Sequence, residues 1–146
     1  MTDHSAQSSY AITIGRLLLA LYFLLPGLAK FGAYELHIGM MERHGVPLAG
    51  PLLIIAGLAN IIGAILLVTN RYVRFTSFGF VVYIIVINFF MHDFWNYSDI
   101  EGQHELQNFV KNLGILAGLL ALAGYSPRRK LTLSGIKQSD KAMSKS

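Results

Sequence analysis

Lysine, asparagine and histidine side chains lie near the ends of long apolar stretches in this sequence. The set is Lys30, Asn88, His92, Lys111 and Asn112. An imidazole can donate a hydrogen bond or a proton to a carbonyl oxygen, and nearby ammonium groups can stabilise the negative charge that follows. These residue types therefore favour a pocket for an oxygenated ring, such as a quinone head group.

Aromatic residues surround His92 along the chain. Phe89, Phe90, Phe94 and Trp95 all lie within three residues of it, and aromatic rings form the apolar walls of many small-molecule sites. We expect His92 to be the catalytic group of the pocket. The expected ligand-binding residues are Lys30, Asn88, Trp95, Lys111 and Asn112.

The histidines do not form a metal motif. His37, His44, His92 and His104 lie in two segments between apolar stretches, without HExxH or another close ligand spacing. The chain has no cysteine, which excludes disulfides and thiolate-bound metals. A haem is not expected either, because its axial ligands would have to lie inside a helix bundle. We therefore expect no metal site and no intrinsic cofactor.

The apolar stretches that position these residues are long enough to cross a membrane. They are Ala11–Ala29, Pro51–Val68, Phe75–Met91 and Phe109–Tyr125, and a spanning helix needs about 17–25 mostly apolar residues. Hydrophobic residues make up 53% of the 146-residue chain and charged residues only 14%, whereas soluble domains usually carry about 25% charged residues. The sequence therefore predicts an all-α protein, a four-helix bundle in the lipid bilayer.

The charged residues divide the chain into regions and give it a direction. Residues 1–10 are polar, residues 11–125 hold the four spans, and residues 126–146 form a basic tail with six basic residues and one acid. The link Thr69–Arg74 adds two arginines on the same side, while six of the acids lie on the other side. Lys and Arg collect in cytoplasmic loops, so we expect a bacterial plasma (inner) membrane protein with both termini in the cytoplasm. This direction places the expected quinone-like pocket near the outer face.

This orientation accounts for the basic charge without nucleic acid as a partner. The composition of the tail predicts a flexible segment that is either simply solvated or attracted to anionic lipid.

The two segments on the expected outer face predict short amphipathic helices. In Lys30–Gly50, apolar residues at helical spacing indicate an interfacial helix, and Gly45 suits its end. In the second segment, Ser98 followed by Glu101 resembles a capping box. This pattern predicts a helix that begins there and continues into the fourth span.

Two polar residues lie within the spans. Arg16 is about a turn and a half inside the first span, and Asn60 is in the middle of the second. Ionisable residues in a membrane are costly and are usually paired or functional. Arg16 either turns inward toward Asn60 or extends to the inner headgroups, and Asn60 has the alternative of a hydrogen bond to another helix.

Gly114 and Gly118 form a GxxxG element in the fourth span. Small residues at this spacing let helices approach closely. The element predicts either packing within the bundle or a face for a homo-oligomer.

Several of these stretches together resemble the DoxX family of small four-span membrane proteins, over about residues 10–125. The matching positions are Gly15, Arg16, Phe23, Gly27, Lys30, Gly45, Pro47, His92, Phe94, Trp95 and the stretch FVKNLGILAGLL at the start of the fourth span. The family commonly has a glutamate in the second span where this chain has Asn60. An Arg–Glu pair would thus become Arg16 with an amide that does not titrate.

The resemblance implies an integral membrane component of a quinone-linked oxidoreductase or an oxidative-stress system. Members of the family are associated with membrane oxidoreductase assemblies, including a thiosulfate:quinone oxidoreductase subunit, and with responses to quinone stress. A partner oxidoreductase subunit would then supply the electrons.

Two alternatives are a non-catalytic scaffold or anchor for a partner enzyme and a small-molecule transporter. The lack of a self-sufficient catalytic set favours the scaffold. The transporter would have to oligomerise, because four spans are few.

Overall fold

A computed structural model of the chain describes residues 10–143. Four of its helices are long and apolar enough to cross a membrane: α1 (Tyr10–Gly32), α3 (Ala49–Val68), α4 (Val73–Met91) and α5 (Asp99–Tyr125). They confirm the predicted all-α bundle and its four spans. Of the polar segment predicted at residues 1–10, all but Tyr10 lies outside the described residues.

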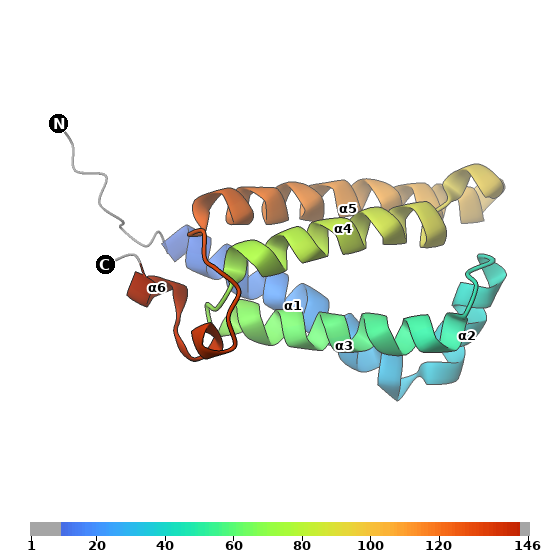
Figure 1. The fold of residues 1–146 in the computed structure, drawn as a ribbon. Helices are drawn as coiled ribbons and strands as arrows, with labels where there is room; N and C mark the ends of the chain where they lie inside the picture. Colours follow the sequence, from blue (N-terminus) through green and yellow to red (C-terminus); the bar gives the residue numbers. More distant parts are fainter. Residues whose placement is uncertain (1–9, 144–146) are drawn as a thin grey trace.

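The four helices pack as two antiparallel pairs, with α1 along α3 and α4 along α5 (Figure 1). We call the end of the bundle at which α1 begins and α5 ends the terminal end, and the opposite end the distal end. Glycine permits the close approach of α1 to α3. A Cβ atom on Gly27 would lie 2.9 Å from Asn60 Cβ and 3.3 Å from the Gly57 carbonyl oxygen.

The apolar core lies in the terminal half of the bundle. The Phe23 and Phe80 rings stack there, with centroids 3.6 Å apart and planes 4° from parallel. The other buried members of the cluster are Ala20, Ala64, Leu67, Val73, Ile84, Leu119 and Leu122. Most of the polar interior contacts described below lie in the middle and distal parts of the bundle, whereas those of Arg16 lie at the terminal end.

Short helices cover the distal end. The short helix predicted between the first two spans is confirmed as α2 (Tyr34–Arg43), and Gly45 follows it with φ of +67°. The Gly45 and Val46 amides donate to the carbonyl oxygens of Glu42 and Met41, which is a Schellman motif and explains the need for glycine. A short 3-10 helix, η1 (Phe94–Asn96), follows α4.

The start of α5 corrects one sequence prediction. Ser98 is the N-cap residue, as expected, but its side chain makes no capping hydrogen bond. The hydroxyl lies 3.4 Å from Asp99 Oδ2 instead. The capping box with Glu101 is therefore wrong, although the helix begins at the predicted place and runs without a break into the fourth span.

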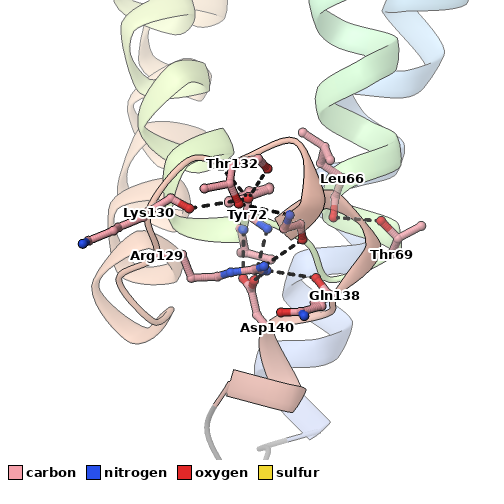
Figure 2. Close-up of polar contacts among 10 residues, drawn as sticks. Leu66, Thr69, Tyr72, Arg129, Lys130, Thr132, Gln138 and Asp140 are labelled. Atoms are coloured by element: carbon pink, nitrogen blue, oxygen red, sulfur yellow. Dashed lines mark hydrogen bonds and ion pairs between the residues drawn. The ribbon is translucent and has the colours of Figure 1, made fainter. Parts of the chain in front are cut away.

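The prediction of a flexible tail is wrong for residues 126–143. This segment folds back over the terminal end and includes η2 (Ser134–Lys137) and α6 (Asp140–Met143) (Figure 1). The Asp140 carboxylate accepts hydrogen bonds from the backbone amides of Tyr72 and Val73 at 3.1 and 3.0 Å (Figure 2). A carboxylate there satisfies unpaired amides at the start of α4 and is favoured by the helix dipole.

Arg129 and Tyr72 hold the folded tail in place. The Arg129 Nη1 atom lies 2.7 Å from Asp140 Oδ1, and both side chains are about 95% buried. The guanidinium also lies over the Tyr72 ring, 4.4 Å from its centroid. The Tyr72 hydroxyl donates to the Thr132 carbonyl oxygen at 2.8 Å (Figure 2). We call Tyr72, Arg129, Thr132 and Asp140 the tail latch.

Candidate functional site

A chain of buried hydrogen bonds joins α1, α5 and α4 inside the membrane-spanning part. The Tyr22 hydroxyl donates to Asn112 Oδ1 at 2.9 Å, and Asn112 Nδ2 donates to Asn88 Oδ1 at 2.8 Å. Asn88 Nδ2 in turn donates to the Phe109 carbonyl oxygen at 3.2 Å. Both amides are at least 95% buried, so these bonds satisfy groups that would otherwise be costly in an apolar interior.

The same interface continues to the distal surface. His92 lies one helical turn beyond Asn88 on α4, and its Nδ1 atom is 2.7 Å from Glu105 Oε2 on α5. Residues four apart share a helix face, so the antiparallel α4–α5 pair places the two contacts at successive turns. We call Tyr22, Asn112, Asn88, His92 and Glu105 the polar path.

Tyr22 also borders a groove between α1 and α5. The groove has a volume of about 410 Å³, which falls in the range of about 300–1,000 Å³ typical of small-molecule sites. Its lining is almost wholly apolar and includes Leu19, Ile115 and Gly118, with Arg16 and Tyr22 as the polar groups. Tyr22 therefore joins an apolar groove on the surface of the bundle to the polar path.

The GxxxG glycines do not pack two helices of the bundle tightly together. A Cβ atom on Gly118 would meet Leu19 Cδ1 only at 4.0 Å, and one on Gly114 would meet nothing within 4 Å. Gly118 leaves room for the α1–α5 groove, and Gly114 is exposed. The homo-oligomer face expected at these residues stays a prediction.

The two polar residues within the first two spans do not meet. Arg16 is 92% buried, and its Nη1 atom donates to the carbonyl oxygens of Leu67 and, at 3.1 Å, Val68. It therefore caps the last turn of α3, whose carbonyls lack partners within the helix and attract positive charge. Neither arrangement considered for Arg16 from the sequence is the one observed.

Asn60 forms a hydrogen bond to another helix, which was the alternative considered for it from the sequence. Its Nδ2 atom donates to the Tyr83 hydroxyl on α4 at 3.3 Å. The Asn60 Oδ1 atom is buried without a hydrogen-bond partner among the described residues. This contact ties the α1–α3 pair to the α4–α5 pair in the middle of the bundle.

A second polar cluster connects the links at the distal end. His44 Nδ1 donates to Asp93 Oδ1 at 2.7 Å and lies 3.2 Å from the Tyr97 hydroxyl. Asn96 Nδ2 donates to the other Asp93 carboxylate oxygen at 2.7 Å. Burial first, and then nearby carboxylates, raise the pKa of Tyr97 above its ordinary value. The cluster joins the segment after α2 to η1.

The structure brings together only part of the predicted site. Asn88 and Asn112 bond to each other, and His92 pairs with Glu105 at the next turn. Lys30 donates to the Pro26 carbonyl oxygen of its own helix at 3.4 Å, and Lys111 is exposed on α5.

Trp95 is half exposed and packs against aromatic rings at the distal end. Its centroid lies 6.1 Å from Phe89, 5.2 Å from Phe94 and 6.3 Å from Phe109. Within residues 10–143, the acids and histidines form no group of three or more that could hold a metal ion.

Sequence reasoning did not identify Tyr22 as part of the site. A tyrosine within a span reads as an apolar residue or an interface residue, and its partner Asn112 is 90 residues away. The available signal was local: Gly15, Leu19 and Tyr22 follow one another at helical spacing on the face that lines the groove. Sequence reasoning likewise did not identify Glu105 as the partner of His92.

Comparisons with known proteins agree with the architecture. The family profile of the DoxX proteins matches residues 11–93. An uncharacterized protein of Haemophilus influenzae is 32% identical over 113 residues, which are 77% of each chain. The inner membrane protein YphA of Escherichia coli is 26% identical over 125 residues, which are 86% of this chain and 89% of YphA. No solved structure matches significantly.

Proposed function

Because this chain belongs to the DoxX family of membrane proteins, we propose that it is the membrane component of a quinone-linked oxidoreductase or oxidative-stress system. A quinone-like ring would bind in the α1–α5 groove beside Tyr22. The observation that carries the proposal is the contact between this apolar groove and the polar path. Family and fold alone would not be enough, since one fold serves many functions.

The groove fits the two chemical parts of such a ligand. Its apolar lining includes exposed Leu18 and small residues such as Gly15 and Gly118, which suits an isoprenoid chain that enters from lipid. A bound quinone supplies two-electron, two-proton chemistry, with the electrons delivered by a partner oxidoreductase subunit. The protein's own part is to seat the ring and to accept a hydrogen bond from a hydroxyl of its reduced, quinol form.

Tyr22 is the residue placed for that hydrogen bond. Asn112 fixes the hydroxyl at 2.9 Å, so its oxygen is held at the groove wall with a lone pair left to accept a bond from a ligand hydroxyl. The polar path then leads along α4 and α5 to His92 and Glu105, which are partly exposed at the distal end.

The test compares two tyrosine variants of α1. Tyr22→Phe removes one hydroxyl from the groove, and Tyr10→Phe removes one from the exposed start of the same helix. Purified protein is analysed by mass spectrometry for retained quinone or quinol and is titrated calorimetrically with a short-chain quinol, whose hydroxyl can donate to Tyr22. We expect Tyr22→Phe to weaken binding about fivefold, since one net hydrogen bond contributes about 1 kcal/mol, and Tyr10→Phe to leave it unchanged.

Failure of the unaltered protein to bind this class of ligand would overturn the proposed function. If the unaltered protein retains neither quinone nor quinol and releases no heat when the quinol is added, the quinone role fails. Co-purification of a partner enzyme under those conditions would favour the scaffold instead.

The proposed orientation places both termini, and therefore the tail latch, in the cytoplasm of a bacterial cell. It rests on the basic residues at the terminal end and the acids at the distal end. The chain has no cysteine, so Ser98→Cys and Ser134→Cys can each be labelled alone with a membrane-impermeant reagent on intact cells. We expect labelling of Ser98→Cys only, and labelling of Ser134→Cys only would reverse the orientation.

A further inference from the structure

A second pocket lies at the terminal end, between the start of α4 and the segment that follows α5. Its volume is about 300 Å³. The residues that line it and matter here are Tyr72, Arg74, Phe75, Phe78, Arg128 and Leu131. It is separate from the groove that borders Tyr22, which lies between α1 and α5.

The pocket carries positive charge that no carboxylate neutralises. Arg74 Nη1 donates to the carbonyl oxygens of Ala123 and Ser126 at 3.0 and 3.4 Å, and these uncharged partners fix the guanidinium without cancelling its charge. Arg128 is exposed. Among residues 10–143, neither arginine forms an ion pair with an acid, and the acid at this end, Asp140, is already paired with Arg129.

The other half of the pocket is apolar and faces outward. Phe75 and Phe78 are 58% and 43% exposed on the first two turns of α4, and Leu131 is 59% exposed. Arg128 and Leu131 come just after α5 ends at Tyr125. The pocket therefore lies at the boundary between the spanning helices and the water, where apolar side chains can meet hydrocarbon and arginines can meet lipid headgroups.

We propose that this pocket binds the headgroup of an anionic glycerophospholipid from the adjoining leaflet. A guanidinium matches the oxygens of a phosphodiester in a forked, charge-assisted arrangement, and basic pockets at the ends of spanning helices bind such headgroups. The aromatic side chains would contact the acyl chains. A zwitterionic lipid fits less well, because its ammonium group would be repelled by the two unpaired arginines.

The tail latch builds the pocket as well as closing the terminal end. Tyr72 lines the pocket and also bonds to Thr132, while Arg129 bonds to the carbonyl oxygens of Gln138 and Gly135 at 2.9 and 2.7 Å. The segment with Arg128 and Leu131 is thereby held against α4. Lipid and folded tail should consequently stabilise each other, because a ligand that binds only the folded form adds to its stability.

The experiment measures the melting temperature of the full chain in detergent with added phosphatidylglycerol, phosphatidylcholine or inorganic phosphate. Arg128→Gln is the test variant, because this side chain is exposed and its loss should not unfold the protein. Lys137→Gln is the matched control, since it removes an equal charge from an exposed tail position outside the pocket. Arg74→Lys keeps the charge but loses the fork.

We expect phosphatidylglycerol to raise the melting temperature and the other two additives to leave it nearly unchanged. Arg128→Gln should raise the phosphatidylglycerol concentration needed for half of the shift about fivefold, as expected for one basic residue near an anionic surface. Lys137→Gln should change that concentration less than twofold, and Arg74→Lys should weaken the response.

Three results would overturn the proposal. An equal shift with phosphatidylcholine would show a site without charge selectivity, and an equal shift with inorganic phosphate would show a site for a free anion. An equal loss in Arg128→Gln and Lys137→Gln would show that diffuse tail charge, and not the pocket, attracts the lipid.

Discussion

Replacement of Asp140 by alanine should release the tail from the bundle while leaving the four spans folded. The carboxylate accepts hydrogen bonds from the Tyr72 and Val73 amides at 3.1 and 3.0 Å and pairs with Arg129 at 2.7 Å. Asp140→Ala would leave two backbone amides without their acceptor and the Arg129 guanidinium without its charged partner. The spans depend instead on side-chain packing in the core around Phe23 and Phe80, which the substitution reaches only through the backbone amide of Val73.

The size of the effect follows from burial. Both side chains of the Arg129–Asp140 pair are about 95% buried, and removal of one partner from a buried pair costs about 3–5 kcal/mol. The released tail regains water around Arg129, so the lower end of that range applies to its detachment. A change of about 3 kcal/mol raises the population of the detached tail on the order of 100-fold.

Limited trypsin digestion in detergent provides the assay. Cleavage after Lys130 requires the segment to leave α4, and its initial rate follows the detached population when detachment is fast compared with cleavage. We expect cleavage there to be about 100-fold faster in Asp140→Ala, since that is the change in population. Asp140→Asn should show a smaller increase, because an amide oxygen can still accept a backbone hydrogen bond.

Lys141→Gln, which alters an exposed neighbour, is the control and should be cut after Lys130 at the original rate. The reasoning is refuted if Asp140→Ala is cut there no faster than this control. It is refuted equally if Asp140→Ala loses its helical signal before the tail is cut, because the latch would then support the whole bundle.

Two further predictions concern the interior of the bundle. Gly27→Val should destabilise it by about 1–3 kcal/mol through overpacking against Asn60, whereas Gly114→Val should be nearly neutral because its Cβ meets nothing within 4 Å; equal denaturation midpoints in detergent would contradict this. Arg16→Met should cost about 1.5–3 kcal/mol through loss of charged hydrogen bonds to the end of α3, with partial recovery in Arg16→Lys. An unchanged unfolding free energy for Arg16→Met would show that the contact contributes no stability.

The spans and the short helix α2 could be predicted because their signals are local. A helix in lipid needs only sufficient length and apolar character, and the runs Pro51–Val68 and Phe75–Met91 agree with α3 and α4 to within two residues. Gly45 marked the end of α2 because the turn after that helix requires a positive φ. The basic composition of the tail wrongly predicted a flexible segment, because composition does not show which groups Asp140 contacts.

Tertiary structure alone decided which polar residues meet. Near the helix ends, Lys30, His92 and Lys111 looked alike in the sequence, yet Lys111 is exposed and His92 pairs with Glu105. A helix turns 100° per residue, so neighbours such as Lys111 and Asn112 point in different directions, and the partner of each depends on the rotation and register of two packed helices. By itself the sequence determined a DoxX-like bundle of four spans with polar segments between them, and only packing joined the polar path to the α1–α5 groove.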